Sequence, residues 1–345
     1  GCGGGTTAET ETPAETPAAS AEEPDFEALK AGEELVLSIG YASAEGTSSD
    51  LILRENGEIL DQASNGKITF DIYPAAQLGG DREMAESVQL GDQDILLSAP
   101  SPLISFIPEL ALLDLPMAFA GYSYEQIDKV TSGEVGDFYD KISAAYEKAG
   151  FKLLKLYNTR MYRVMSTNKV INNIEDFNGV RIRTMENKYH MNFWNSLGAS
   201  ATPLNFAELY LALQQGVVDA QENPVVVLVL NGLYEQQKYI IDTNHVLFFH
   251  NYIMNLDTWN SLTPAQQVMI QDMVDDTALK TAEVGEKDDA DFRQKAADAG
   301  VEFITPDETL LSAMKEKAQE TAEMIATDVG QDLVDSLFNS LDQAK

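Results

Sequence analysis

Residues 179–224, with the sequence GVRIRTMENKYHMNFWNSLGASATPLNFAELYLALQQGVVDAQENP, contain the change of pattern that decides the fold. Apolar and cationic side chains alternate over residues 180–183, which is the two-residue period of a strand. Over residues 186–197 apolar side chains recur every fourth residue, which predicts a helix with one apolar face. Gly198 ends that helix. The stretch therefore begins with a strand and an amphipathic helix.

The second half of this stretch predicts another helix and a polar loop. After the short run 201–204, Asn205 can cap the helix, with Glu208 in the capping-box position. Gly216 closes it, because glycine accepts a left-handed C-cap without steric cost. Residues 221–224 are expected to form a polar loop whose proline begins the next helix. The order of elements indicates an α/β unit with polar loops gathered at one end of a sheet.

The same alternation of strands and helices extends in both directions. Upstream, the pattern predicts strands at 35–40, 67–73 and 94–98, with helices at 49–63 and 78–90, the beginning of an open, mostly parallel sheet. Downstream of these, residues 122–150 are predicted to be helical, and residues 151–157 and 161–166 are predicted to be strands that carry the chain between domains. The valine-rich run 225–230 favours a strand by propensity, but the Asn-Pro start favours a helix, which we predict. The C-terminal part predicts helices at 263–300 and 306–344 with a strand at 301–304.

Length and charge limit the function classes. With 345 residues the chain fits two domains and a tail. Its formal net charge of -33 argues against nucleic-acid binding, because phosphate recognition needs a basic face. No apolar run approaches the ~20 residues of a membrane span. Three histidines and one cysteine form no recognisable metal-binding pattern, so we expect neither metal nor cofactor.

The single cysteine, Cys2, lies in a glycine run at the start of the sequence. Small residues around a cysteine resemble the end of a bacterial lipoprotein signal, so Cys2 is the expected lipid-attachment residue; the alternative is a residue left by cloning. Residues 6–24 are rich in Thr, Glu, Ala and Pro and have no apolar face. We therefore expect residues 1–33 to be a disordered tether that holds the protein at a membrane surface.

Two motifs carry a resemblance to a known family. Residues 73–83 (YPAAQLGGDRE) and the nested motifs within 198–224, which end in QENP, resemble the solute-binding proteins of TRAP transporters, the DctP-like family. Order and spacing agree from about Leu35 to the C-terminal helices. A QENP motif alone would be weak evidence for this family, but the whole set of motifs at constant spacing is specific to it.

The resemblance implies a two-domain periplasmic-binding-protein-like fold: two open sheets flanked by helices, with a ligand cleft between them. On this basis residues 34–160 with 249–288 form the first domain, and residues 161–248 with 289–345 the second. It also implies an extracytoplasmic, monomeric, non-enzymatic protein, anchored to the outer face of the cell membrane or periplasmic. Such a protein captures a small organic acid and delivers it to the membrane subunits of a TRAP permease driven by an ion gradient.

Four residues match the family's ligand contacts by spacing. The arginine that pairs with the ligand carboxylate is similar in position to Arg183, and a second arginine falls on Arg163. The asparagine of QENP is Asn223, and the aromatic residue of the long motif is Phe206. Arginine suits this role because its planar fork donates two parallel hydrogen bonds to a carboxylate. Each has an ordinary alternative. Arg181 and Arg183 could both be solvated side chains of an edge strand. Asn223 could be a helix cap, and Phe206 could belong to the apolar core.

Three further residues are candidates for the cleft. Tyr189 and Trp194 lie on the helix after Arg183, where packing is the alternative role. His250 lies in the aromatic run 248–252, where the family crosses between domains. The loop 98–102 has no charge, whereas sialate-binding members look different there, which argues against sialate. Dicarboxylates, sugar acids, aromatic acids and other acids all remain possible ligands.

Two other function classes compete. A sensory ectodomain of the same fold would bind the same ligand but signal to another partner. A serine hydrolase would use Ser166 and Lys169, which match the S-x-x-K pattern of penicillin-binding enzymes. The K-T-G motif that accompanies this pattern in those enzymes is absent. No phosphate-binding or dinucleotide-binding glycine motif occurs, so an enzyme is the weaker alternative.

Overall fold

The computed structural model of the protein describes residues 22–345, and nine strands of this part form one mixed sheet. Their order is β2-β1-β3-β8-β4-β7-β5-β6, and β9 pairs with β8. The strands are β1 Leu35–Gly40, β2 Ile68–Tyr73, β3 Ile95–Ser98, β4 Phe151–Thr167, β5 Arg181–Thr184, β6 Ser200–Pro203, β7 Ala220–Asn223, β8 Tyr239–Asn255 and β9 Glu302–Ile304. The prediction at Cys2 and most of the expected tether lie outside the described residues.

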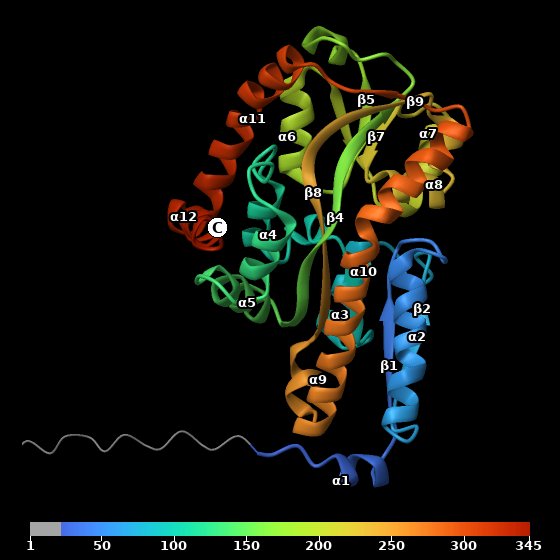
Figure 1. The fold of residues 1–345 in the computed structure, drawn as a ribbon, viewed down its shortest axis with the longest axis vertical. Coiled ribbons are helices and arrows are strands. Elements are labelled where there is room, and N and C mark those ends of the chain that lie inside the picture. The colour runs from blue at the N-terminus through green and yellow to red at the C-terminus, as the bar shows by residue number, and fades with distance from the viewer. Residues whose placement is uncertain (1–21) are drawn as a thin grey trace, which may run out of the picture.

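Two long antiparallel strands, β4 and β8, connect the two halves of the molecule (Figure 1). At one end β8 pairs with β3, which joins β1 and β2; at the other end β4 pairs with β7, which joins β5 and β6. The two expected sheets are thus continuous through these strands. The expected strands 151–157 and 161–166 are both part of β4, whose pairing with β8 shifts register between Asn158 and Tyr162.

Helices cover both halves of the sheet, and α10 passes along both of them (Figure 1). The helices are α1 Phe26–Ala31, α2 Ser48–Ala63, α3 Asp81–Leu90, α4 Tyr124–Thr131, α5 Phe138–Lys148, α6 Lys188–Leu197, α7 Leu209–Gln214, α8 Val225–Leu230, α9 Leu256–Ser261, α10 Pro264–Asp298, α11 Glu308–Val329 and α12 Gln331–Gln343. Helix α10 packs on α2, on β4 and on α8. At Gly285 it approaches β4 so closely that a Cβ would lie 2.0 Å from the Thr159 carbonyl oxygen.

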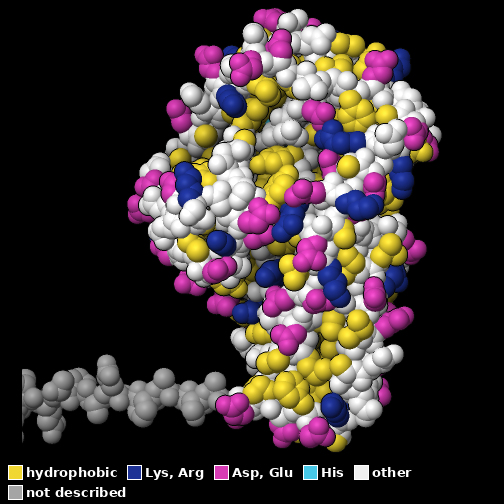
Figure 2. Space-filling model, in the orientation of Figure 1, with side chains coloured by type: hydrophobic (Ala, Val, Ile, Leu, Met, Phe, Trp, Pro, Cys, Tyr) yellow, Lys and Arg dark blue, Asp and Glu magenta, His cyan; other side chains and the backbone are white. Residues whose placement is uncertain are grey.

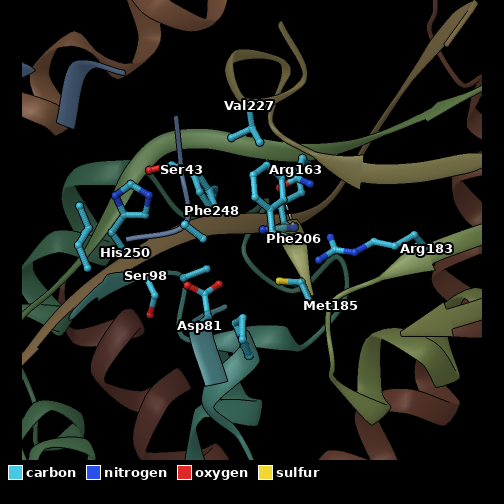
Figure 3. A pocket seen from close by; sticks show the side chains of 15 residues that line it. Ser43, Asp81, Ser98, Arg163, Arg183, Met185, Phe206, Val227, Phe248 and His250 are labelled. Carbon is cyan, nitrogen blue, oxygen red and sulfur yellow. Dashed lines mark hydrogen bonds between the residues drawn. The ribbon is translucent and has the colours of Figure 1, made fainter. Parts of the chain in front are cut away.

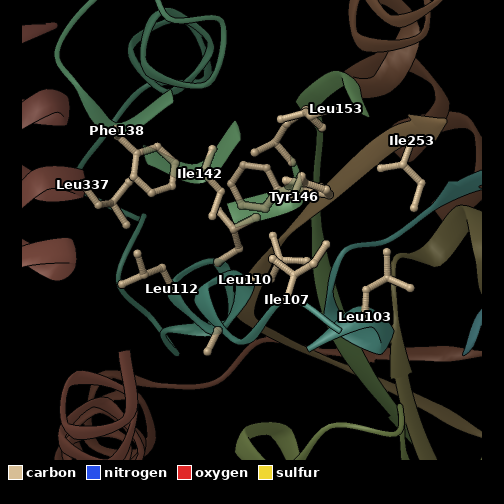
Figure 4. Close-up of a cluster of buried hydrophobic side chains, with 14 of the residues drawn as sticks. Leu103, Ile107, Leu110, Leu112, Phe138, Ile142, Tyr146, Leu153, Ile253 and Leu337 are labelled. Carbon is tan, nitrogen blue, oxygen red and sulfur yellow. The ribbon is translucent and has the colours of Figure 1, made fainter. Parts of the chain in front are cut away.

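Separate apolar cores form on either side of the connecting strands. The core in Figure 4 joins α4, α5 and α12 to the ends of β4 and β8, with Leu337 of α12 near Phe138 of α5. A second core lies between β1, β2, α2 and α10, and two more lie around β5, β7 and their helices. The division of the chain into two domains stays a prediction. However, α12, which that division assigns to the second domain, packs on α4 and α5 of the first.

Several local predictions were wrong in detail. The polar run 221–224 is not a loop, because Ala220–Asn223 pair with β4 as strand β7, and Pro224 is the N-cap of α8 rather than its first residue. Asn205 makes no side-chain capping bond; it precedes a short 3-10 turn, Phe206–Glu208. The valine-rich run is helix α8, as predicted.

Two expected long helices are each divided. Residues 122–150 form α4 and α5 with a break between Thr131 and Phe138. Residues 306–344 form α11 and α12, which meet at Gly330, a residue with a φ of 93° that favours glycine.

Regular structure begins at Phe26, earlier than the expected position near Glu34. Asp25 caps α1 by accepting a hydrogen bond from the Ala28 backbone N–H at 3.0 Å. Leu29, 8% exposed, packs in the core that contains the first half of α10. The expectation that all of residues 1–33 are disordered is therefore wrong for α1.

Acidic side chains are spread over the visible face of the molecule and not gathered in one patch. On the face shown in Figure 2, Asp and Glu side chains are scattered over the whole molecule, with Lys and Arg between them. Among residues 22–345, none of the helices has the length and apolar character that crossing a bilayer requires.

Candidate functional site

A cavity that is open to solvent lies where the two halves meet, and the space within it and at its mouth is about 560 Å³ (Figure 3). Its walls come from the carboxyl ends of β1, β3, β5 and β7, and from the middle of β4 and β8. Ligands of α/β sheets bind at such strand ends. The lining residues are Ala42, Ser43, Asp81, Leu97, Ser98, Ala99, Pro102, Arg163, Arg183, Met185, Phe206, Asn223, Val227, Phe248 and His250.

Arg183, on strand β5, extends into this cavity and is only 2% exposed. Its Nε donates to the Leu204 carbonyl oxygen at 2.9 Å, which fixes the side chain. Its two terminal nitrogens have no hydrogen-bond partner among residues 22–345. Burial lowers the pKa of Arg183 to about 10, so the guanidinium stays charged at neutral pH. A charged fork aimed into the cavity is suited to a carboxylate.

Arg163, on β4, lines the same cavity, but a carboxylate of the protein already pairs with it. Its Nε donates to Glu222 Oε2 at 2.6 Å and its Nη2 to Glu222 Oε1 at 2.9 Å. The same Nη2 donates to Asn223 Oδ1 at 3.0 Å. Burial alone would raise the pKa of Glu222, but the charge of Arg163 and a hydrogen bond from His245 hold it well below its usual range. Arg163 and Glu222 therefore form a buried pair with no net charge.

The Arg163–Glu222 pair continues into a buried polar network. His245 Nε2 lies 2.8 Å from Glu222 Oε2, and its Nδ1 lies 2.7 Å from the Thr243 hydroxyl. Burial lowers the pKa of His245 more than the Glu222 contacts raise it. His190 Nε2 lies 2.8 Å from Asp114 Oδ1, a carboxylate that also accepts from Asn187 Nδ2 at 2.7 Å.

Sequence reasoning missed these network residues. Glu222 lies inside the QENP motif, so the motif was the available signal for it. The histidines are isolated in the sequence, and nothing there connects them to Glu222.

Asn223 lines the cavity from the end of β7, and its amide is held by the protein. Its Oδ1 accepts from Arg163 and its Nδ2 donates to Gln221 Oε1 at 2.9 Å. The structure thus brings Asn223 to the same cavity as Arg183, though as the last residue of a strand.

The apolar part of the wall includes two phenylalanine rings. The Arg163 Cζ lies 5.4 Å from the centre of the Phe248 ring, and the Arg183 Cζ lies 6.0 Å from that of Phe206. Arginine stacked on an aromatic face gains a cation–π contribution. Phe206 is half-buried, so its ring both supports Arg183 and faces the cavity.

The end of the cavity away from Arg183 is formed by His250 with Ser43 and Ser98 (Figure 3). His250 Nδ1 lies 3.0 Å from the Tyr157 hydroxyl. Burial, with the charge of Arg163, lowers the pKa of His250 to about 4, so the ring is neutral at neutral pH. This end therefore offers uncharged hydrogen-bonding groups.

Asp81, the first residue of α3, is a lining residue that sequence reasoning did not single out, although it lies in the 73–83 motif. Its carboxylate points into the cavity (Figure 3). Burial raises the pKa of Asp81 to about 6, against the lowering effect of Arg183, and Glu186 raises it further.

Two predicted cleft residues lie elsewhere. Trp194 is fully buried and packs against Phe177 and Phe193. The Tyr189 hydroxyl donates to Asp328 at 2.7 Å, away from the cavity lining. Both serve packing, because the apolar face of α6 turns toward the core. Arg181 differs from Arg183 as well: its side chain is 51% exposed and pairs with Asp219 at 2.7 Å.

The residues of the hydrolase alternative are not brought together. The Ser166 hydroxyl donates to Gln237 Oε1 at 2.7 Å, whereas Lys169 Nζ donates to the Asp176 carbonyl at 2.6 Å. In the described part of the chain, no group of three His, Cys, Asp or Glu side chains is placed to hold a metal ion.

Comparison with known proteins gives one consistent family. The model of the bacterial extracellular solute-binding protein family 7, DctP, matches residues 40–328. The chain is 28% identical to the sialic acid-binding periplasmic protein SiaP of Vibrio cholerae, covering 87% of this chain and 91% of that protein. It is 31% identical to the C4-dicarboxylate-binding periplasmic protein DctP of Rhodobacter capsulatus, covering 67% and 68%.

A solved structure shares the whole fold. A TRAP periplasmic solute-binding protein of Desulfovibrio salexigens with bound orotic acid superposes with a TM-score of 0.84 at 26% identity. The match covers 90% of this chain and 99% of the other.

Proposed function

The chain belongs to the bacterial extracellular solute-binding protein family 7, the solute-binding proteins of TRAP transporters, and from this we propose that its cavity captures a small organic acid. The observation that carries the proposal is the Arg183 guanidinium, buried at the cavity wall with two terminal nitrogens free of partners in residues 22–345. Glu222, Asp81 and Glu186 act on this charge only through space, and none of them hydrogen-bonds to it, so a ligand carboxylate would supply the missing hydrogen-bond partner. The names of the compared relatives give sialic acid, C4-dicarboxylate and orotic acid as ligands, all of them acids.

Six of the lining residues have a role in this proposal. Arg183 holds the carboxylate with two parallel hydrogen bonds. Arg163 and Asn223 form a rigid polar wall beside it, because their own bonds to Glu222 and Gln221 fix them. Phe206 and Phe248 contact the body of the ligand, and His250 donates or accepts at its other end.

A ligand screen by thermal shift tests the proposal. Mono- and dicarboxylates, sugar acids, aromatic acids, amines and neutral sugars are each added to the purified protein. A ligand at a hundredfold excess over its dissociation constant adds about 2.7 kcal/mol to the unfolding free energy. We expect shifts from acids only, lost in Arg183→Ala and kept in Arg181→Ala. A strong shift by an amine or a neutral sugar that survives Arg183→Ala would contradict acid capture.

We also propose that the two halves close on the ligand, with β4 and β8 as the connection that bends. The register shift between Asn158 and Tyr162 supports this, because an irregular ladder deforms more easily than a regular one. Small-angle scattering should show a more compact molecule with ligand. Identical profiles at saturation would count against closure.

For location and delivery we propose that Cys2 carries a lipid and that the protein passes its ligand to TRAP permease subunits. The family supports an extracytoplasmic protein, and the cysteine in a glycine run supports the anchor. In the producing cell, Cys2→Ser should move the protein from the membrane fraction to the soluble one. Ligand uptake by vesicles that contain the permease should require the protein. Uptake that is equal without the protein would refute delivery.

A further inference from the structure

The polar groups around the cavity offer one arginine fork for a ligand carboxylate and place a carboxylate of the protein beside it. On the basis of the proposed acid capture, we propose that this site selects acids with a single carboxylate, and that Asp81 excludes a second one. The inference rests on three features of the cavity wall, which lie at Arg163, at Asp81 and at the His250 end.

First, the cavity has two cationic lining residues, and only Arg183 lacks a carboxylate of residues 22–345 as a hydrogen-bond partner. Arg163 pairs with Glu222 through two short hydrogen bonds and shares a third with Asn223. Its charge is therefore already matched inside the protein. Arg183 makes a single hydrogen bond, to a neutral carbonyl oxygen, and is the lining cation without an acidic hydrogen-bond partner in residues 22–345. Glu222, Asp81 and Glu186 act on the charge of Arg183 through space only, so its terminal nitrogens are left to bind one ligand carboxylate.

Second, Asp81 places a carboxylate in the cavity between the two ends (Figure 3). Within residues 22–345 it forms no hydrogen bond or ion pair through its side chain, unlike Asp114, whose oxygens bind Asn187 and His190. Its raised pKa, about 6, still leaves it ionised at pH 8. A second ligand carboxylate in this space would meet a like charge in surroundings of low dielectric, where repulsion is strong.

Third, the end opposite Arg183 has no cation to offset that repulsion. His250 is neutral at this pH, since its pKa is lowered to about 4. The Ser98 hydroxyl donates to Asn251 Oδ1 at 3.0 Å and keeps its oxygen as an acceptor. These groups bind a hydroxyl, carbonyl or amide of a ligand. Together with Asp81 they favour an acid whose far end is polar and uncharged.

Matched ligand pairs test this inference at pH 8. Succinate is compared with succinamate, and adipate with adipamate, because each pair has nearly the same shape and differs by one charge. Calorimetry on the full-length protein should show the monoamide binding at least about tenfold more tightly than the diacid, a difference of about 1.4 kcal/mol. In Asp81→Asn, and in Asp81→Ser as a second neutral variant, the diacid should gain about tenfold and the preference should disappear.

The control is Glu186→Gln. The negative charge of Glu186 helps to raise the pKa of Asp81. Glu186 nevertheless pairs with Arg82 at 3.7 Å and does not line the cavity. This variant also loses one negative charge, so it shows whether removing any nearby negative charge abolishes the preference for the monoamide. We expect less than about a twofold change in the preference.

The possible outcomes distinguish a failure of the selectivity from a failure of acid capture itself. Diacids that bind as well as monoamides to the wild type, or a preference unchanged in Asp81→Asn and Asp81→Ser, would overturn the selectivity and leave acid capture standing. A preference lost equally in Glu186→Gln would overturn the assignment to Asp81. If no acid binds and Arg183→Ala behaves like the wild type, acid capture fails and this inference fails with it.

Discussion

The walls around Arg163 and Arg183 belong to one cavity but are built differently. Arg163 is joined by hydrogen bonds to Glu222 and Asn223, and through Glu222 to His245. Arg183 has one hydrogen bond, to a backbone oxygen, and its side chain extends into the cavity. The difference shows that a buried arginine can serve the fold or the ligand, depending on whether the protein supplies its counter-ion. The predictions below are designed to separate these two roles.

The largest effect on stability is expected at the Arg163 side. Arg163→Ala leaves Glu222 buried without its main partner, which costs roughly 3–5 kcal/mol of unfolding free energy. Urea unfolding measures this loss. The double variant Arg163→Met with Glu222→Leu should recover much of the stability, because an apolar pair needs no counter-ion. A loss below about 1 kcal/mol in the single variant would contradict the structural role.

The largest effect on binding is expected at the Arg183 side. Arg183→Ala should weaken acid binding by at least about thirtyfold, since removing one partner of a buried ion pair costs roughly 2–5 kcal/mol. Arg183→Lys should recover little, because an ammonium does not reproduce the planar fork. Neither variant should lower the unfolding free energy of the ligand-free protein by more than about 1 kcal/mol, the typical worth of the lost bond to Leu204, and Arg183→Ala should raise it because the buried charge is removed. Calorimetry and urea unfolding of the same preparations decide this; a large stability loss with unchanged affinity would reverse the assignment.

A smaller, pH-dependent effect is expected at Asp81. Its pKa in the folded protein, about 6, is above its usual value, so ionisation costs stability. As the pH rises through about 6 the folded protein loses the stability that the protonated carboxyl gave it. Asp81→Asn should therefore raise the melting temperature of the ligand-free protein at pH 8 and leave it unchanged at pH 4. An equal shift at both pH values would show that the carboxyl charge is not responsible.

The smallest effect is expected at Arg181, which provides the control for Arg183. The two arginines lie on one strand, but Arg181 is exposed and pairs with Asp219. Arg181→Ala should change ligand affinity and unfolding free energy each by less than about 1 kcal/mol, as is typical of exposed pairs. If Arg181→Ala weakened binding more than Arg183→Ala, the comparison of the two residues would fail.

Much of the architecture could be predicted from the sequence, because the relevant signals are local. Strand β1 and helices α2 and α8 follow from period, caps and proline position, and the structure confirms them. The breaks within 122–150 and at Gly330 were missed although glycines mark them locally: Gly133, Gly136 and Gly330 have φ of 82°, 76° and 93°, which favour glycine. The strand at 221–223 was missed because its polar residues pair with β4 in the interior, a non-local effect that no local pattern contains.

For the site, the sequence indicated the residues that line the cavity better than the charged residues that act on them. Arg183, Arg163, Asn223, Phe206 and His250 all line the cavity, and their contact with a ligand stays a prediction. Tyr189 and Trp194 were misplaced because helical spacing places them on α6 without showing which face meets the cavity. Glu222 and Asp81 were overlooked because their importance depends on contacts between distant parts of the chain. Glu222 pairs with Arg163, whereas Asp81 feels the charge of Arg183 without a hydrogen bond to it.

The most direct test of the account is the structure of the protein in complex with the best acid found in the screen. The account predicts both carboxylate oxygens within hydrogen-bond distance of the Arg183 terminal nitrogens, with the Arg163–Glu222 pair still intact. A carboxylate bound elsewhere, with Arg183 turned away from the ligand or Glu222 displaced from Arg163, would contradict it.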